Sequence, residues 1–554
     1  MLAPSLVDHP GRGGANRLRA MPPEKHPQRG AIQAPRGTRD LYPEETARIR
    51  YIQKAWTDAA IRHGFEEIEG PTFEMSELYA VKSGEGILGE LFQSFSGKSP
   101  EEIEQVRQTG RAPFALRPEF TPTLARMYAA RAKQLPKPCK WFTAGPYFRA
   151  ERPQRGRLRE FLQWNCDVIG DDGTPEGRAQ ADADIIGVAV GLFGWLGLGS
   201  ESVRIGVNHR EMLGAQLAQR QIMNERAADF LSLVDRQSKM SRADFLVAAA
   251  AKGFDESLIT DIERAVGIDR GAVELDTQDS RERANEIVRA VFVEHHRELI
   301  DSVAKRAWDA ARADFEGLLA QLNEARIARW ARLDPTIVRG LAYYTGTVFE
   351  AIADGERAVA GGGRYDNLIE LMGGPPTPAV GFAMGDVVLG LLLEDKGLMP
   401  EGAELLDAIS APGASRRPEV FVIGADDETT DPMVRRLVAD LRRGVESERA
   451  RDESLKPWDA RRYEPASGGV RPMHARHTYK STRNLKKLLS DAERQLSRFA
   501  AVVHGQDRVQ LRDLDARAEL TPRDVPGLPD DVAEFSVSPQ SSVYVGRAVA
   551  ALLA

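Results

Sequence analysis

The chain of 554 residues lacks most features of secreted, membrane or metal-binding proteins. Its two cysteines, Cys139 and Cys166, lie in no CxxC pair and no Cys/His cluster. They cannot form a disulfide framework or a structural zinc site, so we expect a cytoplasmic protein without a resident metal. No apolar run reaches membrane-spanning length and no signal-peptide core is present, so we expect no membrane association.

The chain also lacks a net basic charge. It holds 75 Lys and Arg against 82 Asp and Glu, which gives a formal net charge of −7. This balance argues against indiscriminate binding to nucleic acid, so any such binding would depend on local basic patches. The length predicts several domains with ample core.

Residues 147–170, YFRAERPQRGRLREFLQWNCDVIG, are predicted to form two strands joined by a charged loop. Alternate side chains of a strand share a face, so Phe161, Gln163, Asn165 and Asp167 point one way and the apolar residues between them point the other. The first half adds an arginine and a glutamate on one face. Such a hairpin can hold a polyanion beside a cationic or amide group. The alternative is an edge hairpin with a solvated polar face.

Four further segments carry informative patterns. Residues 338–352 (VRGLAYYTGTVFEAI) end in a β-prone run and contain two adjacent tyrosines, which on an extended segment would point to opposite faces. Residues 361–366 (GGGRYD) are predicted to form a glycine-rich bend. Residues 378–385 (PAVGFAMG) are predicted to form a strand that leads into an apolar helix over 386–395. Residues 115–127 (ALRPEFTPTLARM) place polar side chains just before a helix.

In this order, the five segments resemble the histidyl-tRNA synthetases, a family of class II aminoacyl-tRNA synthetases. The resemblance begins near Arg36 (RGTRDLYPEE). FRAERPQRGR is similar to class II motif 2 in its histidine-specific form, and RGLAYYTGTVFE to the signature that separates the histidine enzymes from other class II synthetases. A helix over residues 44–63, followed by a strand and Pro71, resembles motif 1, which in the family builds the dimer interface.

The resemblance implies an α+β fold, with an antiparallel sheet flanked by helices, a helical insertion and a C-terminal α/β anticodon-binding domain. The expected regions are a disordered basic tail (1–34), the first half of the catalytic domain with motifs 1 and 2 (35–206), the helical insertion (207–330), the second half of the catalytic domain with the histidine signature and motif 3 (331–400), a linker (401–417), and the anticodon-binding domain with a C-terminal extension (418–554). We expect the tail to be solvated rather than to recruit tRNA, and Met21 is an alternative start. Residues 444–478 form a polar insertion that the patterns do not explain.

The resemblance also implies the chemistry. The histidine carboxylate attacks the α-phosphate of ATP and expels pyrophosphate, so catalysis depends on positioning and on fixed positive charge. A guanidinium suits this role because it keeps its charge and binds phosphate with two hydrogen bonds. Arg149 matches the motif 2 arginine, and Arg339 matches the histidine-specific arginine on the other side of the phosphate. We name both as catalytic.

Binding roles follow from the same match. The residues expected to bind histidine are Glu119, Thr121, Gln163, Asp167, Arg339, Tyr343 and Tyr344. The residues expected to bind ATP are Arg149, Glu151, Arg157 and Phe161. Gln154 and Arg155 are expected to meet the acceptor end of the tRNA, and Mg²⁺ to arrive with the nucleotide. The family usually has glutamate at position 167, so the aspartate here shortens the reach by one methylene.

The expected function is therefore that of a histidine-tRNA ligase, acting as a homodimer on L-histidine, ATP and histidine tRNA. One alternative is a synthetase-like regulatory subunit that binds histidine without catalysis, although such paralogues usually lack the tyrosine signature and the anticodon domain. Another is a tRNA-binding scaffold with a dead site. That interpretation predicts the loss of Arg149, Glu119 or Arg339, and all three are present.

One expected residue is missing. Class II enzymes usually carry an arginine in motif 3 that stacks on adenine opposite the motif 2 aromatic residue. Here the expected position holds Val388, and no arginine occurs between Tyr365 and Ser415. We therefore expect adenine to lie between Phe161 and an apolar wall. The absent cation–π contact is worth about 0.5–2 kcal/mol, so ATP should bind more weakly than in arginine-bearing relatives.

Overall fold

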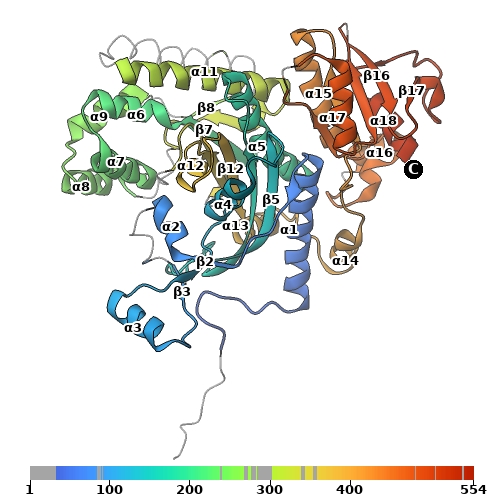
Figure 1. Ribbon diagram of the computed structural model, residues 1–554. Helices are drawn as coiled ribbons and strands as arrows, with labels where there is room; N and C mark the ends of the chain where they lie inside the picture. Colours follow the sequence, from blue (N-terminus) through green and yellow to red (C-terminus); the bar gives the residue numbers. More distant parts are fainter. Residues whose placement is uncertain are drawn as a thin grey trace, which may run out of the picture.

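A computed structural model gives the fold. It describes residues 33–83, 89, 91–237, 240–266, 272–275, 282, 302–337, 343–353, 358–453, 455–480, 482–505, 507–538 and 542–553. Arg339 and nearly all of the predicted tail over 1–34 lie outside these residues. The described chain has a large central lobe, with helices of the region 207–330 at one side and the C-terminal region at the other (Figure 1).

A mainly antiparallel sheet forms the centre of the large lobe. Within the described residues it has nine strands in the order β1-β5-β6-β12-β11-β10-β7-β9-β8, and only β1–β5 and β7–β9 pair in parallel. The bounds are β1 Glu66–Glu67, β5 Cys139–Phe148, β6 Glu160–Ile169, β7 Val203–His209, β8 Val273–Glu274, β9 Ala331–Leu333, β10 Thr347–Ala353, β11 Ala358–Arg364 and β12 Ala379–Gly385. The predicted antiparallel sheet flanked by helices is confirmed.

Helices cover both faces of this sheet. On one face, α1 (Pro43–Arg62), α5 (Pro175–Trp195), α11 (Ser302–Glu324) and α13 (Asp386–Asp395) share the main hydrophobic core. On the other face, α4 (Thr121–Arg131) and α12 (Leu368–Leu371) pack in a smaller core. The predicted helices over 44–63 and 386–395 are thus confirmed. None of the helices in the described ranges is long and apolar enough to cross a membrane.

The triple glycine of residues 361–363 lies inside the sheet, so the predicted bend is wrong. These residues belong to β11, which pairs with β10 on one side and β12 on the other. A Cβ at Gly362 would collide with the carbonyl oxygen of Gly381, and one at Gly363 would lie 2.7 Å from the Thr347 oxygen. Glycine allows this close backbone approach in a strand interior.

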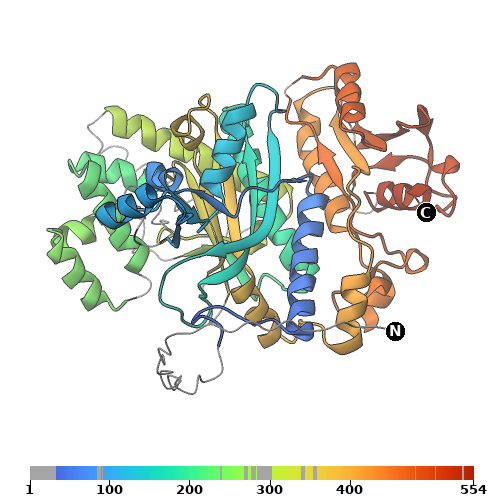
Figure 2. The ribbon, with the colours of Figure 1, turned by 60° about the horizontal axis from the view of Figure 1, so that its bottom comes forward.

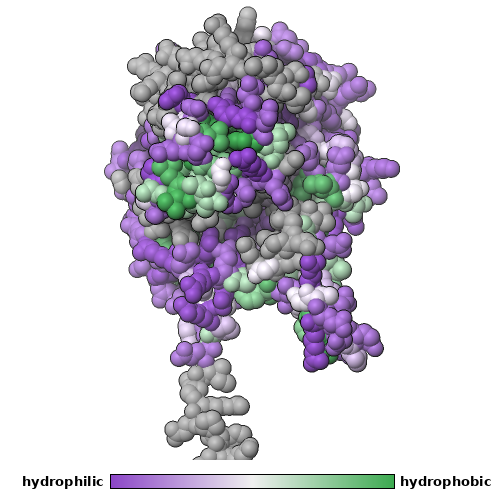
Figure 3. Space-filling view, turned by 90° about the vertical axis from the view of Figure 1, so that its left-hand side faces the viewer, coloured by the Kyte–Doolittle hydropathy of each residue, from purple (hydrophilic) through white to green (hydrophobic). Residues whose placement is uncertain are grey.

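Two smaller units flank the lobe. One is a three-stranded sheet in the order β2-β4-β3 with two helices; its members are β2 Phe73–Met75, β3 Gln93–Ser94, β4 Phe114–Leu116, α2 Ser76–Ser83 and α3 Pro100–Thr109. The other has its own hydrophobic core; its helices are α6 Arg210–Gln219, α7 Asn224–Gln237, α8 Arg242–Ala251 and α9 Glu256–Val266. Figure 3 views the molecule from the left-hand side of Figure 1, where the surface is mainly polar with apolar patches.

Residues 401–417 contain one short helix, α14 (Gly402–Ser410), which packs on α1. The C-terminal domain that follows is an α/β unit beside α1 (Figure 2). Its sheet has the order β14-β13-β15-β16-β17, and β18 also pairs with β16. The bounds are β13 Val420–Gly424, β14 Ala475–His477, β15 Phe499–Val503, β16 Arg508–Asp513, β17 Ala518–Leu520, β18 Phe535–Ser536, α15 Asp431–Arg443, α16 Glu448–Glu453, α17 Leu485–Arg494 and α18 Ser542–Leu553.

The polar insertion over 444–478 leaves the C-terminal domain and returns to it. Val445 and Val470 exchange two main-chain hydrogen bonds of 2.7 and 2.8 Å, which bring its two ends together. Its far end returns to the large lobe, where Tyr463 stacks on Trp195 of α5 with ring centroids 5.9 Å apart. The insertion thus helps to join the two domains.

A buried ionic network also joins the domains. Asp184 on α5 accepts from Lys140 of β5 at 3.2 Å and from Arg442 of α15 at 3.1 Å. His477 of β14, 3.4 Å away, and the Tyr479 hydroxyl contact the same carboxylate. Burial alone would raise the pKa of Asp184, but the two cations hold it well below its usual value.

Candidate active site

The hairpin predicted over residues 147–170 is confirmed and carries most of the candidate residues. β5 and β6 pair in antiparallel fashion over their whole length. At the tip of the connecting loop, Gln154 and Arg157 exchange main-chain hydrogen bonds of 2.8 and 3.0 Å, and Gly156 has a left-handed φ of 74°. Gln154 and Arg155 are exposed at this tip, where a large ligand could reach them.

Arg149 follows β5 directly, and its guanidinium is held from two sides. Its Nε donates to the Pro118 carbonyl oxygen at 3.1 Å. The guanidinium carbon lies 5.1 Å from the centroid of the Phe161 ring on β6. A fixed positive charge and a half-buried aromatic ring therefore lie side by side, an arrangement that can bind a phosphate group and a planar base.

Glu151 and Arg157, both expected to bind ATP, form an ion pair with each other inside the loop. Both side chains are partly exposed, and exposed ion pairs contribute little free energy. The loop base is fixed separately, because Arg159 donates its main-chain N–H to the Gly37 oxygen at 2.8 Å. A polyphosphate could therefore compete for Arg157 without disturbing the hairpin.

The predicted alternation of β6 is confirmed. Trp164 and Cys166 lie in the main core, whereas Gln163 and Asn165 face the other side of the sheet. Asn165 donates to the Tyr147 hydroxyl at 3.2 Å. Gln163 is only 6% exposed, and its Oε1 has no hydrogen-bond partner among the described residues. A buried acceptor without a donor is costly, so this oxygen can be satisfied by a ligand N–H.

Asp167 continues the polar row of β6. It is 3% exposed and accepts a 2.5 Å hydrogen bond from the Tyr365 hydroxyl. Burial raises the pKa of Asp167 to about 7, although the bond from Tyr365 opposes the shift. Its carboxyl group therefore changes charge near neutral pH, and a bound ammonium group would favour the ionised form.

The segment that holds Glu119 is fixed by a buried arginine. Arg117 donates from Nε to the Pro146 oxygen at 2.9 Å and from Nη1 to the Gly70 oxygen at 3.1 Å. This places the segment beside the end of β5. Glu119 is half-buried there, and Thr121 is the first residue of α4.

The two adjacent tyrosines lie side by side, so the prediction of opposite faces is wrong. The ring centroids of Tyr343 and Tyr344 are 4.5 Å apart, because both residues precede β10 in a turn rather than in the strand. Tyr344 is buried, while Tyr343 is half-buried against Tyr365, with centroids 6.1 Å apart. Tyr365 thus contacts both Tyr343 and Asp167, which links the signature segment to β6.

Tyr365 and its neighbour Arg364 were not among the predicted site residues. Arg364 is fully buried, with its guanidinium 2.8 Å from Asp171, 2.7 Å from Asp182 and 3.3 Å from Asp366. Burial opposes the charge, but the three carboxylates raise the pKa of Arg364. Both residues belong to the segment GGGRYD, for which the glycines alone led to a prediction, that of a bend.

A sequence profile described as "Histidyl-tRNA synthetase" matches residues 37–386. Histidine–tRNA ligase of Haloarcula marismortui is 35% identical over 410 residues, which cover 74% of this chain and 82% of that protein. The chain belongs to the histidyl-tRNA synthetase family. The Thermococcus kodakarensis histidine–tRNA ligase is 32% identical over 413 residues, with the same shares covered.

Solved structures of the histidyl-tRNA synthetase family share the fold. A histidine–tRNA ligase subunit from Alicyclobacillus acidocaldarius has a TM-score of 0.52 at 24% identity and covers 67% of this chain and 99% of its own. The histidyl-tRNA synthetase from Nostoc sp. PCC 7120 has a TM-score of 0.52 at 19% identity, with 89% and 97% covered.

Val388, where an arginine was expected, lies near the start of α13. Val388 is 8% exposed and packs in the main core with residues such as Leu389. The guanidinium that does lie at this helix start belongs to Arg39, whose Nη2 is 2.6 Å from Asp386. Asp386 also accepts the Leu162 main-chain N–H at 2.8 Å, which ties α13 to β6.

Proposed function

We propose that this site activates histidine with ATP and transfers it to tRNA. Membership of the histidyl-tRNA synthetase family gives the reaction, which is that of a histidine–tRNA ligase. The observation that supports the location is the Arg149 guanidinium beside the Phe161 ring, next to the polar row of β6. One face of the sheet thus offers both a phosphate site and an amino-acid site.

Histidine would be held at its two ends. The α-ammonium needs acceptors, which Gln163 Oε1, Asp167 and Glu119 offer. The imidazole presents one donor and one acceptor nitrogen, which can form hydrogen bonds with Glu119 and the Tyr344 hydroxyl. Tyr343 would form one wall of the histidine pocket, and Thr121 would line it from the start of α4. A site of buried polar partners rejects amino acids that leave these partners unpaired.

ATP would lie across the hairpin. Arg149 neutralises the charge that develops on the α-phosphate, Arg339 does so from the opposite side, and Phe161 stacks on adenine. Arg157 would exchange Glu151 for a phosphate oxygen. Among the residues that the structure describes, no three His, Cys, Asp or Glu side chains gather as a metal site. Mg²⁺ would arrive with the phosphates of ATP, where Glu151 would be its protein carboxylate and charge neutralisation its contribution.

The remaining regions would bind tRNA. Gln154 and Arg155 at the exposed loop tip would meet the acceptor end, and the C-terminal domain over 418–554 would bind the anticodon. For the transfer step we assign no side chain as base.

We further propose that the enzyme is a cytoplasmic homodimer. Exposed apolar side chains near the motif 1 region support a contact surface: Tyr42 is 69% exposed, Phe73 54% and Met75 50%. Size-exclusion chromatography with light scattering tests the dimer. A monomer at micromolar concentration would contradict it.

The decisive assay for the function is histidine-dependent exchange of labelled pyrophosphate into ATP by the full chain. We expect exchange with histidine and with no other common amino acid. Arg149→Ala should lower the exchange rate about 100-fold or more, as expected for the loss of one preorganised charge. Arg131→Ala, at the exposed end of α4, is the matched control and should retain the wild-type rate. Histidine binding without exchange in the wild type would favour the regulatory-subunit alternative.

A further inference from the structure

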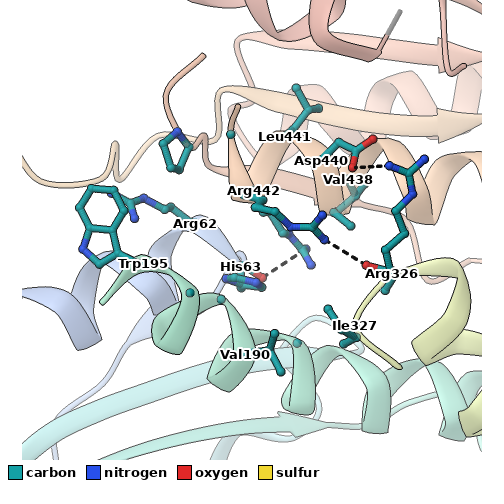
Figure 4. A pocket seen from close by; sticks show the side chains of 18 of the residues that line it. Arg62, His63, Val190, Trp195, Arg326, Ile327, Val438, Asp440, Leu441 and Arg442 are labelled. Carbon is teal, nitrogen blue, oxygen red and sulfur yellow. Dashed lines mark hydrogen bonds and ion pairs between the residues drawn. The ribbon is translucent and has the colours of Figure 1, made fainter. Parts of the chain in front are cut away.

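A cavity of about 810 Å³ lies between the two domains, away from the candidate active site (Figure 4). Its walls come from the end of α1, from α5, from residues 321–330 and from α15. The α5 wall presents Gly187, Gly191 and Gly194. A Cβ at Gly194 would meet no atom within 4 Å, whereas one at Gly191 would lie 2.5 Å from the His63 ring. The volume is in the range of small-molecule sites.

The lining of this interdomain cavity is strongly basic. Eight arginines and four carboxylates line it, an excess of four positive charges. Some of this charge is already paired, since Arg442 contacts Asp184 at 3.1 Å and Arg326 contacts Asp440 at 3.6 Å. Arg462 also pairs with Glu446, and Arg435 pairs with Glu324, which lies outside the lining. The lining arginines without an ion-pair partner among the described residues are Arg62, Arg329, Arg443 and Arg451.

Arg62, the last residue of α1, is the most informative of them. It is only 9% exposed, and its guanidinium carbon lies 4.2 Å from the Trp195 ring centroid (Figure 4). Within the described ranges, its Nε has no hydrogen-bond partner and no carboxylate lies within ion-pair distance of it. Burial lowers the pKa of Arg62, and the charges of Asp58 and Glu419 offset part of this effect from beyond ion-pair distance. A buried guanidinium without a hydrogen-bonded carboxylate is only partly compensated, so an anion that reached it would gain binding energy from it.

Two further arginines of the lining also lack a carboxylate partner among the described residues. Arg443, from α15, donates to the Ala325 carbonyl oxygen at 3.2 Å. Arg329 lies on the wall formed by residues 321–330 and is exposed. Cationic groups thus reach the cavity from both domains.

We propose that the interdomain cavity binds a small phosphate-bearing anion through Arg62, Arg329 and Arg443. A guanidinium binds phosphate oxygens with two parallel hydrogen bonds, and several guanidinium groups without carboxylate partners suit a multiply charged anion better than a monocarboxylate. The backbone of a nucleic-acid duplex is too bulky to reach a guanidinium that is nine-tenths covered. Because its ligands come from both domains, the bound anion would hold the C-terminal domain against the large lobe.

Calorimetric titration of the full chain with inorganic pyrophosphate, and separately with AMP, tests this site. Pyrophosphate also enters the active site, so the informative quantity is the difference between variants. Arg62→Gln should remove one binding event or weaken it about tenfold or more, as expected for the loss of a charged hydrogen-bond donor. Arg50→Gln, an exposed change on the same helix, should leave both titrations unchanged. The exchange rate of Arg62→Gln should stay within about twofold of wild type, which separates this test from that of the active site.

Arg62 is buried, so a second variant guards against loss of folding. Arg329→Glu changes an exposed residue, keeps the fold and places a carboxylate on the cavity wall. It should weaken the same binding event about tenfold. If Arg62→Gln affects both probes, the shared phosphate group is recognised; if it affects AMP alone, a nucleotide is the ligand. Wild-type titrations for both variants, or no binding beyond the active site, would overturn the proposal.

Discussion

Asp167 shows how burial of a single residue can set a pH dependence. Its folded pKa of about 7 lies above its ordinary value of 3.8. Between these values the folded protein keeps a proton that the unfolded chain has lost. The resulting stabilisation is therefore complete below about pH 4 and is lost as the pH rises toward 7.

We expect Asp167→Asn to remove this dependence. An amide still accepts from Tyr365 but cannot ionise. Relative to wild type, the variant should gain thermal stability between pH 4.5 and 7.5, on the order of 1–4 kcal/mol. In the proposed site it should also bind histidine more weakly at pH 8, because the substrate ammonium would lose its anionic partner. Melting curves and histidine titrations across this pH range measure both effects. A constant difference in melting temperature between the two proteins would refute the assigned shift.

At the residue scale, strand periodicity predicted which side chains of β6 share a face. Alternate residues of a strand always point to the same side, so the faces follow once the strand is known. The same pattern could not reveal Tyr365, which is almost 200 residues from Asp167 in the chain and reaches it through sheet pairing. The sequence did not indicate a role for Arg62 for a similar reason, because the residues around it come from two domains that are distant in the chain.

At the scale of elements, β11 depends on its glycines. We expect Gly362→Ala to destabilise the protein strongly, by about 2 kcal/mol or more, because the added methyl group meets backbone that cannot move aside. Gly214→Ala is the control: it lies in α6 with no atom within 4 Å of the new Cβ, and alanine favours a helix. Thermal unfolding measures both. Equal stability of Gly362→Ala and wild type would contradict the close strand packing.

The position of Val388 in α13 changes what an arginine there would do. We expect Val388→Arg to destabilise the protein by several kcal/mol, since it places an unpaired charge in the main core. ATP binding should therefore not tighten. Val387→Arg, one residue earlier and half-buried, should cost less. Thermal unfolding and ATP titration test this pair. A stable Val388→Arg protein with tighter ATP binding would mean that the space is open.

Long helices and the hairpin were predictable because their patterns extend over many residues, as in α1 and β6. The glycine triplet and the tyrosine pair were not. Glycines mark both turns and close strand contacts, and only the neighbouring strands β10 and β12 decide between them. The tyrosine pair was likewise predicted on an extended segment, but it precedes β10, so the two side chains do not alternate between faces.

At the scale of the whole molecule, the Asp184 network couples the two domains. Replacing its central carboxylate would leave Lys140 and Arg442 buried without a counter-ion. We expect Asp184→Asn to cost about 3–5 kcal/mol and to loosen the domain contact. Asp407→Asn, at an exposed position of α14, is the control. Calorimetry should show a lower or divided transition for Asp184→Asn alone. An unchanged single transition would show that other contacts suffice.

The two cysteines have a practical consequence for labelling chemistry. Both are buried, and burial raises the pKa of Cys139 to about 12 and that of Cys166 well above its usual value. Maleimide reagents attack the thiolate, so neither native residue should react in the folded protein. A cysteine introduced at the exposed Gln154 would then be the single labelled site, with the native cysteines left in place. A fluorophore at this position would report the binding of any ligand at the tip of the loop between β5 and β6.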